Sequence, residues 1–324
     1  LQYPERSQVH LYGDIQMIDD NTTIQCDQLV YHTNQNYAVA YNDVVINQDN
    51  KVIYCDTLYY WDEIDSLKGL GNIKIIENGA NRSLQSDRIH LSFSDSLTQI
   101  LELSHSAEVF NISQTKVSKD SPLMVFEDEL KGEKIEVIIK NDSIRNLNIY
   151  GMAIANYHVV KDSLLMGINN VSGDSIMINF SDNVLNRMQV FGGGIGEFIP
   201  EKGNSKVDST VYYKAEYIDY IIQLEQSILN KDAEVDYGET SIKSGNIIVD
   251  WNTNMLDAEY AFETYPIVFK TNESPMIGES MQFDLINKKG VIKKGKTDFD
   301  DGFYQGKIIQ REEPNILHMF HSKY

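Results

Sequence analysis

The 324-residue chain has few of the residues that interrupt or cross-link a fold, with six prolines and two cysteines. So few prolines allow long continuous strands, since proline in sheets is confined to edges and bulges. Cys26 and Cys55 are either buried free thiols or one disulfide between adjacent strands, and two cysteines do not identify a compartment. No apolar run reaches the length of a transmembrane helix, and residues 1–10 lack the apolar core of a signal peptide.

Basic residues are also scarce, because 28 Lys and Arg stand against 48 Asp and Glu, a formal net charge of −20. This charge repels nucleic-acid phosphates and anionic membrane surfaces, so no nucleic-acid partner is predicted. The one basic stretch, KKGVIKKGK at 288–296, is interpreted as a lysine-protected turn between edge strands.

Motifs of catalysis and metal binding are missing as well. The chain has no Gly-x-Ser-x-Gly and no His-Glu-x-x-His sequence. The glycines of FGGGIGEF at 191–198 fit a turn or bulge, DFDDG at 298–302 lacks the distal Glu of a calcium loop, and HMFH at 318–321 has no third ligand in view. The sequence therefore predicts a non-enzymatic protein without cofactor, catalytic residues or metal site.

What the chain does contain is a short phrase that recurs about eight times: a small residue, an acid, any residue, an aliphatic, any residue, and an apolar residue. CDQLVY and CDTLYY are the first two copies, and the copies start at positions 26, 55, 86, 132, 173, 215, 244 and 278. Persistent self-similarity at a period of 29 to 46 residues indicates a stacked repeat architecture.

A second phrase follows each copy of the first one. It is an apolar pair and then a Gly or Asn turn that leads into another strand, as in YAVAYNDVVI from Tyr37 and SLKGLGNIKII from Ser66. Alternation with period two, and Val, Ile, Tyr and Phe bounded by Asn, Asp, Gly and Ser, predict strands. Each repeat is thus expected to hold two strands with a turn between them in a nearly all-β chain.

The acidic position of the first phrase is filled in all copies but one, where Gly245 stands; the acids are Asp27, Asp56, Asp87, Glu133, Asp174, Glu216 and Glu279. A column of carboxylates repels itself unless something offsets the charge. Two interpretations stay open: each acid accepts local backbone N–H bonds at a corner, or divalent cations bind between rungs.

Together the phrases resemble the OstA/LptA-like repeat. Residues 9–46, VHLYGDIQMIDDNTTIQCDQLVYHTNQNYAVAYNDVVI, carry its wording. Later stretches such as LKGEKIEVIIKNDSIRNLNIYGMAIANY are similar to the N-terminal periplasmic region of LptD-type lipopolysaccharide assembly proteins of Bacteroidetes-like bacteria. The resemblance covers roughly residues 8–310.

The resemblance implies an elongated, open β-jellyroll of about eight stacked two-strand repeats. It implies a periplasmic protein associated with the outer membrane, whose apolar groove carries the acyl chains of lipopolysaccharide and which stacks through edge strands on other Lpt-type jellyrolls. Four segments are expected: repeats 1–3 over 1–112, repeats 4–5 with an inserted loop over 113–200, repeats 6–8 over 201–313, and a tail or the start of a following region over 314–324.

Period-two alternation assigns the inward residues of this groove. The lipid-groove candidates are Ile24, Leu29, Tyr31, Ile53, Leu58, Tyr60, Ile89, Leu91, Ile135, Val137, Ile176, Ile178, Ile218 and Tyr220. The same residues would equally fill the closed core of a sandwich. A β-solenoid carbohydrate-active enzyme and a structural surface adhesin therefore remain the alternative functions.

Overall fold

A computed structural model describes residues 2–3, 7–19, 22–48, 50–61, 66–77, 79, 82–95, 97–141, 143–181, 184–270, 273–299, 302–313 and 316–323. The chain divides into two compact units. Unit 1 comprises residues 1–114, 125–155 and 177–184, and unit 2 comprises 115–124, 156–176 and 185–324. The predicted segment boundaries at 112, 200 and 313 stay a prediction, and Pro314, where the predicted tail begins, lies outside the described residues.

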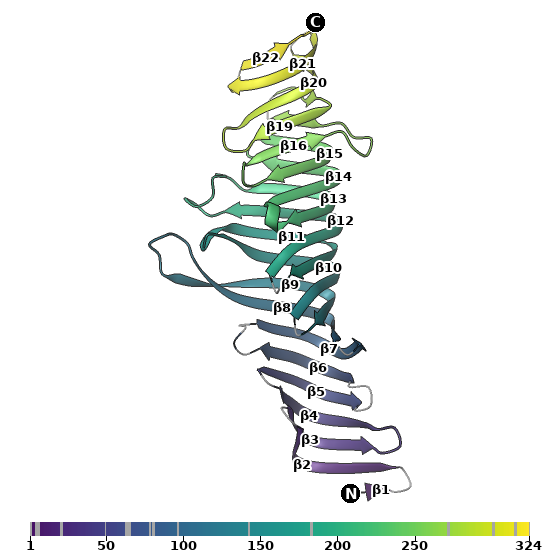
Figure 1. Ribbon diagram of the computed structural model, residues 1–324. Coiled ribbons are helices and arrows are strands. Elements are labelled where there is room, and N and C mark those ends of the chain that lie inside the picture. Colours follow the sequence, from purple (N-terminus) through teal and green to yellow (C-terminus); the bar gives the residue numbers. More distant parts are fainter. Residues whose placement is uncertain are drawn as a thin grey trace. The chain divides into compact units, whose positions relative to one another are not determined.

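The chain is all-β, as the sequence predicts, with strands that follow one another in chain order within each unit (Figure 1). A single 3₁₀ turn, Ile222–Leu224, is the one helical element among the described residues. The strands are β1 (Gln2–Tyr3), β2 (Gln8–Asp19), β3 (Thr22–His32), β4 (Tyr37–Gln48), β5 (Lys51–Trp61), β6 (Ser66–Glu77), β7 (Arg82–Asp95), β8 (Thr98–Lys116), β9 (Leu123–Lys140), β10 (Ser143–Lys161), β11 (Leu164–Ser181), β12 (Val184–Pro200), β13 (Val211–Ile221), β14 (Gln226–Tyr237), β15 (Thr240–Asp250), β16 (Met255–Glu259), β17 (Ile267–Lys270), β18 (Met276–Ile277), β19 (Ser280–Asp284), β20 (Lys289–Phe299), β21 (Gly302–Glu313) and β22 (Ile316–Phe320).

In unit 1 the two phrases of the repeat occupy alternate strands of an antiparallel meander. Each strand from β2 to β8 pairs with the next one. The small-acid phrase lies on β3, β5 and β7, and the apolar phrase with Gly or Asn lies on β4 and β6. The prediction of two strands per repeat is confirmed.

One detail of that prediction is wrong, because the Gly or Asn of the second phrase bends a strand and does not connect two strands. β4 continues through Asn42 and Asp43, whose φ angles are 63° and 48°. The register between β4 and β5 shifts at this point, so that both residues stand opposite the single residue Asp56. Such a β-bulge turns the strand sharply. Every strand pair from β2 to β7 carries a register shift at its small-acid phrase.

The composition of the phrase follows from this corner. Gly71 on β6 has a φ angle of 77°, and a Cβ there would lie 2.2 Å from Oδ2 of Asp56. Any residue other than glycine at this position would therefore force the backbone or the acid to move. Asn72 donates from Nδ2 to Oδ2 of Asp56 over 2.9 Å. The small position is crowded from inside: a Cβ on Gly173 would meet Cγ1 of Val190 at 2.5 Å.

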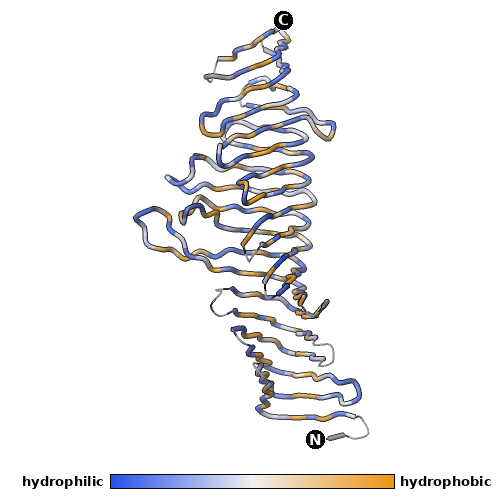
Figure 2. Tube along the Cα trace, viewed as in Figure 1, coloured by the Kyte–Doolittle hydropathy of each residue, from blue (hydrophilic) through white to orange (hydrophobic). Residues whose placement is uncertain are grey.

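Unit 2 shows two walls that meet at the same kind of corner. β15 bends so that its residues 240–243 pair with β17 and its residues 246–250 pair with β16. β20 divides likewise between β18 and β19. The first wall thus contains residues 211–214, 233–237, 240–243 and 267–270, and the second contains 217–221, 226–230, 246–250, 255–259 and 280–284. Orange apolar and blue polar positions alternate along these strands (Figure 2).

The basic stretch at 288–296 does not lie between edge strands. It forms the start of β20, which hydrogen-bonds to β19 on one side and to β21 on the other. The interpretation as an edge-protecting turn is therefore wrong. Lys293, Lys294 and Lys296 of this strand are exposed, whereas Ile292 is buried.

An aromatic ladder lies on the outer face of unit 1, at the ends of β3, β4 and β5. The rings of His32 and Tyr37 stack with centroids 4.2 Å apart at 7°, Tyr37 stacks on Trp61 at 5.9 Å, and Trp61 on Tyr59 at 6.0 Å. Cross-strand aromatic pairs of this kind stabilise a sheet beyond the area they bury.

Replacing Trp61 with Ala is expected to lower the free energy of unfolding by about 1–2 kcal/mol, because the substitution removes two stacked contacts. Denaturant unfolding followed by circular dichroism measures the change. Tyr12→Ala is the matched control, since Tyr12 is 60% exposed and its ring stacks only at 6.2 Å, on His10. Equal stability of the Trp61 variant and the control would show that the ladder contributes nothing.

Candidate ligand-binding interior

The residues predicted to face inward divide into a buried majority and three that are less buried. Eleven of the fourteen are buried: Ile24, Leu29, Ile53, Leu58, Ile89, Ile135, Val137 and Ile178 in unit 1, and Ile176, Ile218 and Tyr220 in unit 2. Tyr60 and Leu91 are half-buried and Tyr31 is 37% exposed. Tyr31 and Tyr60 come just before the ends of β3 and β5, and Leu91 lies in the last third of β7. Burial places the side chains inside, and whether they touch lipid stays a prediction.

The interior of unit 2 contains a cavity of about 570 Å³, here named the Tyr220 cavity. It is lined by both walls, since Val211 and Val235 come from the first wall and Leu229 and Val249 from the second. Its volume falls within the range of ordinary small-molecule sites, which are mostly apolar with a few convergent polar groups.

Four polar side chains cross this cavity as a chain of hydrogen bonds. The Tyr220 hydroxyl donates to the Tyr213 hydroxyl over 2.8 Å, Tyr213 donates to Oδ1 of Asn169 over 2.7 Å, and Nδ2 of Asn169 donates to the Tyr157 hydroxyl over 3.0 Å. Tyr213 and Tyr220 lie on opposite walls, so their bond spans the interior. Gly196 leaves the space that the Tyr213 side chain needs to reach across the interior, because a Cβ on Gly196 would lie 2.3 Å from the Tyr213 hydroxyl.

Burial raises the pKa of both Tyr213 and Tyr220, because a phenolate in this apolar interior would be poorly solvated. Both groups therefore remain neutral phenols that donate hydrogen bonds. These four residues, named here the Tyr–Asn bar, were only partly predicted. Tyr213 stands two positions before Ala215 and Asn169 four positions before Gly173, so period-two alternation could have marked both as inward, although Asn169 is polar.

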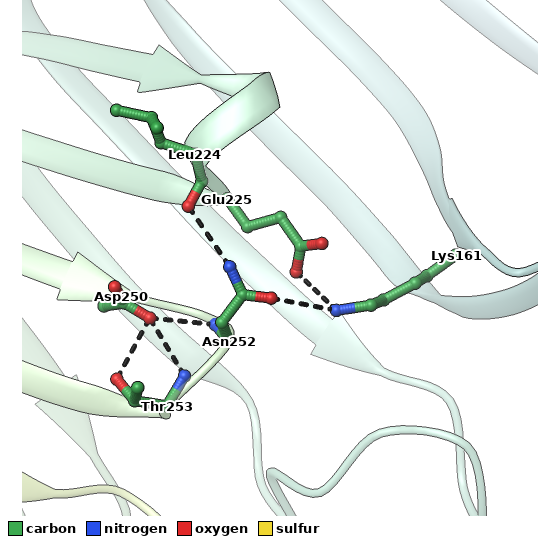
Figure 3. Close-up of polar contacts among 6 residues, drawn as sticks. All are labelled: Lys161, Leu224, Glu225, Asp250, Asn252 and Thr253. Atoms are coloured by element: carbon green, nitrogen blue, oxygen red, sulfur yellow. Dashed lines mark hydrogen bonds and ion pairs between the residues drawn. The ribbon is translucent and has the colours of Figure 1, made fainter.

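Polar contacts in the lining of the Tyr220 cavity join Lys161, at the end of β10, to the turns that follow β13 and β15 (Figure 3). Lys161 donates from Nζ to Oε2 of Glu225 over 2.6 Å and to Oδ1 of Asn252 over 3.2 Å, and Asn252 donates from Nδ2 to the carbonyl of Leu224 over 3.3 Å. The turn that carries Asn252 is fixed by Asp250, whose Oδ1 accepts the backbone N–H groups of Asn252 and Thr253 at 3.0 and 2.9 Å.

A second cavity of about 570 Å³ lies farther along unit 2 and is named the Lys288 cavity. Its apolar lining includes Ile242 and Val268 from the first wall and Met281 and Phe283 from the second. The amine of Lys288 stands at its rim, 5.4 Å from the ring centroid of Tyr237. The two cavities share no lining residue.

The acids of the repeat stay on the outer corner, one per rung, and do not gather in either cavity. Six of the seven are exposed and Glu216 is half-buried. Besides the Asp56 contact, Glu279 accepts a bond of 2.8 Å from Nζ of Lys294. Among the described residues, no group of three or more His, Cys, Asp or Glu side chains is arranged to hold a metal ion. Both interpretations of the acid column remain predictions.

Both cysteines are free and buried, at 6% and 4% exposure. Burial is the main cause that raises the pKa of the Cys55 thiol to about 12, and the charge of Asp56 is the second cause. Burial and then the charge of Asp27 likewise raise the pKa of the Cys26 thiol.

Because the thiolate is the reactive form, neither cysteine is expected to react with Ellman's reagent in the folded protein at pH 8, while both react after unfolding in guanidinium. Rapid reaction of either thiol in the folded protein would contradict this.

The fold and interior define a two-walled, all-β repeat protein with apolar cavities between its walls. Residues 23–120 match the family model described as OstA-like protein, which confirms the OstA-like resemblance for these residues, while the likeness to LptD-type proteins stays a prediction. LptH of Pseudomonas aeruginosa, described as the LptA homologous periplasmic component of the conserved lipopolysaccharide transport device, is similar in structure with a TM-score of 0.29 and 13% identity, over 36% of this chain and 72% of that one. Comparison with curated proteins gives no match. No helix among the described residues is both long and apolar enough to span a membrane.

Proposed function

We propose that this chain is a non-enzymatic conduit for lipopolysaccharide or a related glycolipid, which holds acyl chains between its two walls in the periplasm and passes them toward the outer membrane. The observation that carries the proposal is the apolar interior of unit 2, where both walls line cavities of about 570 Å³ each. A filled structural core would leave no such space.

The physical need for a shield supports this function. A methylene group costs about 0.8 kcal/mol to expose, so an acyl chain of a dozen carbons costs roughly 10 kcal/mol in water. Several such chains cannot cross an aqueous gap unshielded. Where no polar side chain crosses the interior, a repeating wall lowers the cost of movement, because each rung offers the acyl chain nearly the same apolar surface as the rung before it.

The family match supports the same function, since the OstA-like region spans residues 23–120 and the two-strand repeat continues to β19. Within this family we propose either an LptA-like bridge or the N-terminal domain of an LptD-type assembly protein. Edge strands of other Lpt-type jellyrolls would then be its partners, because unpaired strand edges are natural joining sites.

Site-specific photo-crosslinking in cells tests the proposal. A photoreactive side chain in place of Leu58, Ile89 or Leu229, each at most 2% exposed, is expected to capture lipopolysaccharide. The same group in place of Gln25 or Gln85, which are exposed on the outer face, is the matched control and should capture none. Failure at all inward positions, or equal capture at the outer ones, would overturn the function.

The distribution of carboxylates bears on the alternative of a carbohydrate-active enzyme. Glycoside hydrolysis needs two carboxylates at a defined separation on either side of one bond. Here the acids of the repeat stand one per rung on the outer corner and line neither cavity. Asp162 and Glu225 line the Tyr220 cavity, but Glu225 is ion-paired with Lys161 at 2.6 Å. The lipid conduit accounts for the cavities, which a purely structural adhesin does not need.

A further inference from the structure

A loop of unit 2 covers part of the Tyr220 cavity. Residues 201–210, named here the strap, follow β12 and carry no regular secondary structure, yet Val207 in their middle is only 3% exposed. Val207 and its neighbours Asn204, Ser205 and Lys206 line the cavity. A loop valine is buried this deeply only when it packs into an apolar interior, so the strap roofs the cavity.

The beginning of the strap is tied to strand β11. The backbone N–H of Glu201 donates to the carbonyl of Met166 over 2.8 Å, and Nδ2 of Asn204 donates to the carbonyl of Leu165 over 2.7 Å. These bonds involve backbone carbonyls near the end of a paired strand. They anchor this end of the strap and give it a fixed hinge.

The far end of the strap is held by one side chain that joins both walls. Asp208 accepts a bond of 2.5 Å from the hydroxyl of Tyr237, at the end of the first wall, and a bond of 3.0 Å from Nζ of Lys288, in the turn beside the second wall. These two donors lower the pKa of Asp208 to about 2, so the carboxylate is charged at neutral pH. The Asp208 tie therefore holds the far end of the strap to Tyr237 and Lys288, which both line the neighbouring Lys288 cavity.

A second tie lies in the lining of the Tyr220 cavity itself, which includes Lys161 and Glu225. Lys161 at the end of β10 pairs with Glu225, in the turn between β13 and β14 (Figure 3). The side chains of both ion pairs are between 36% and 62% exposed. Exposed pairs of this kind are weak, so both ties can open without disturbing the strands.

Lengthwise passage through the cavity is obstructed from inside. The bond between the hydroxyls of Tyr213 and Tyr220 spans the two walls, and an acyl chain sliding along the interior would have to break it. Buried hydrogen bonds are expensive to leave unmade. Entry from the side, through the gap that the strap covers, breaks the exposed ion pairs, the bond from Lys161 to Asn252 and the bonds between Asp208 and Tyr237. It also lifts Val207 out of the interior, but it leaves the bond between Tyr213 and Tyr220 intact.

We propose that the strap and its two ties form a gate over the Tyr220 cavity, through which the acyl chain of an amphiphile enters from the side. The gate rests on the proposed function, because it presumes an acyl ligand. Opening requires Asp208 to release Tyr237 and Lys288, and Lys161 to release Glu225. The gate sets how fast a chain enters and leaves, while the walls set how tightly it is held.

Energy transfer from Trp251, which lines the cavity, to a dansylated undecanoic acid measures entry directly. The Trp61→Phe substitution removes the only other tryptophan, and all variants are made in this background protein. In stopped-flow mixing, Asp208→Asn, Lys161→Gln and their combination are expected to raise the association and dissociation rates together, each single variant roughly threefold, and to leave Kd nearly unchanged. Asp232→Asn, an exposed acid outside the strap, is the matched control.

The outcomes separate the gate from the function on which it rests. Transfer with unchanged rates in all variants would overturn the gate and leave the lipid function standing. A changed Kd with an unchanged association rate would also overturn it, because Asp208 would then shape the cavity without gating it. No transfer in the background protein would overturn acyl binding in this cavity, and with it the gate.

Discussion

Replacing Gly245 with Asp is expected to lower the free energy of unfolding by about 3 kcal/mol or more, although an acid stands at this position in every other copy of the repeat. A Cβ on Gly245 would lie 1.7 Å from the carbonyl oxygen of Ala261. The obstacle is backbone, which cannot rotate away as a side chain can. The connection between β16 and β17 has to move before any side chain fits.

The local contacts explain why this connection resists movement. Ser244 donates from Oγ to the carbonyl of Glu259 over 2.8 Å, and the backbone of Ala261 exchanges hydrogen bonds with Thr264. Residues on both sides of Gly245 are paired, with β16 after it and β17 before it. A shift of Ala261 therefore disturbs both walls at one corner.

Thermal and denaturant unfolding of Gly245→Asp and Gly245→Ala measure the effect, and both substitutions should be severe because the clash begins at Cβ. Asp87→Gly is the reciprocal control, since it removes an exposed acid from a corner without adding an atom. We expect that control to cost no more than about 1 kcal/mol, the usual penalty of a glycine in a strand. A stable Gly245→Asp protein would refute the steric explanation of the missing acid.

The sequence predicts the strands well because their signal is local. Alternation in KVIYCDTLYY identifies β5, and the repeat places equivalent residues on successive strands. The bend inside β4 could not be foreseen, because Asn42 and Asp43 also suit a connecting turn, and only the partner strand decides between the two. Gly245 shows the same limit, since its reason lies in Ala261, sixteen residues away.

The interior was predictable in its apolar part and not in its polar part. Leu58 and Ile135 follow from period two, because every second side chain of a strand faces the same side. Tyr31 is more exposed than its pattern suggests, since the pattern does not tell where a wall ends. Asn169 is in phase with the buried side of β11, but a polar residue gives no apolar signal there. Val207 lies in a loop and becomes an interior residue only through contacts with distant segments, which alternation does not encode.

The second large effect is expected at the centre of the Tyr–Asn bar. Tyr213→Phe removes one hydroxyl that both accepts from Tyr220 and donates to Asn169, so it leaves two buried groups without these partners. A buried polar group that loses its partner costs about 1–3 kcal/mol. We expect Tyr213→Phe to lower the free energy of unfolding by about 3 kcal/mol, although the ring and its packing over Gly196 are kept.

A double-mutant cycle with Tyr220→Phe distinguishes this mechanism from a simple loss of packing. Tyr220→Phe alone removes only a terminal donor and should cost about 1 kcal/mol. In the Tyr213→Phe background the Tyr220 hydroxyl is already without its acceptor, so its removal should cost nothing further or restore stability. The combined effect is therefore expected to be smaller than the sum of the single effects. Additive losses, measured by denaturant unfolding, would mean that the two hydroxyls act independently and that no bar spans the walls in solution.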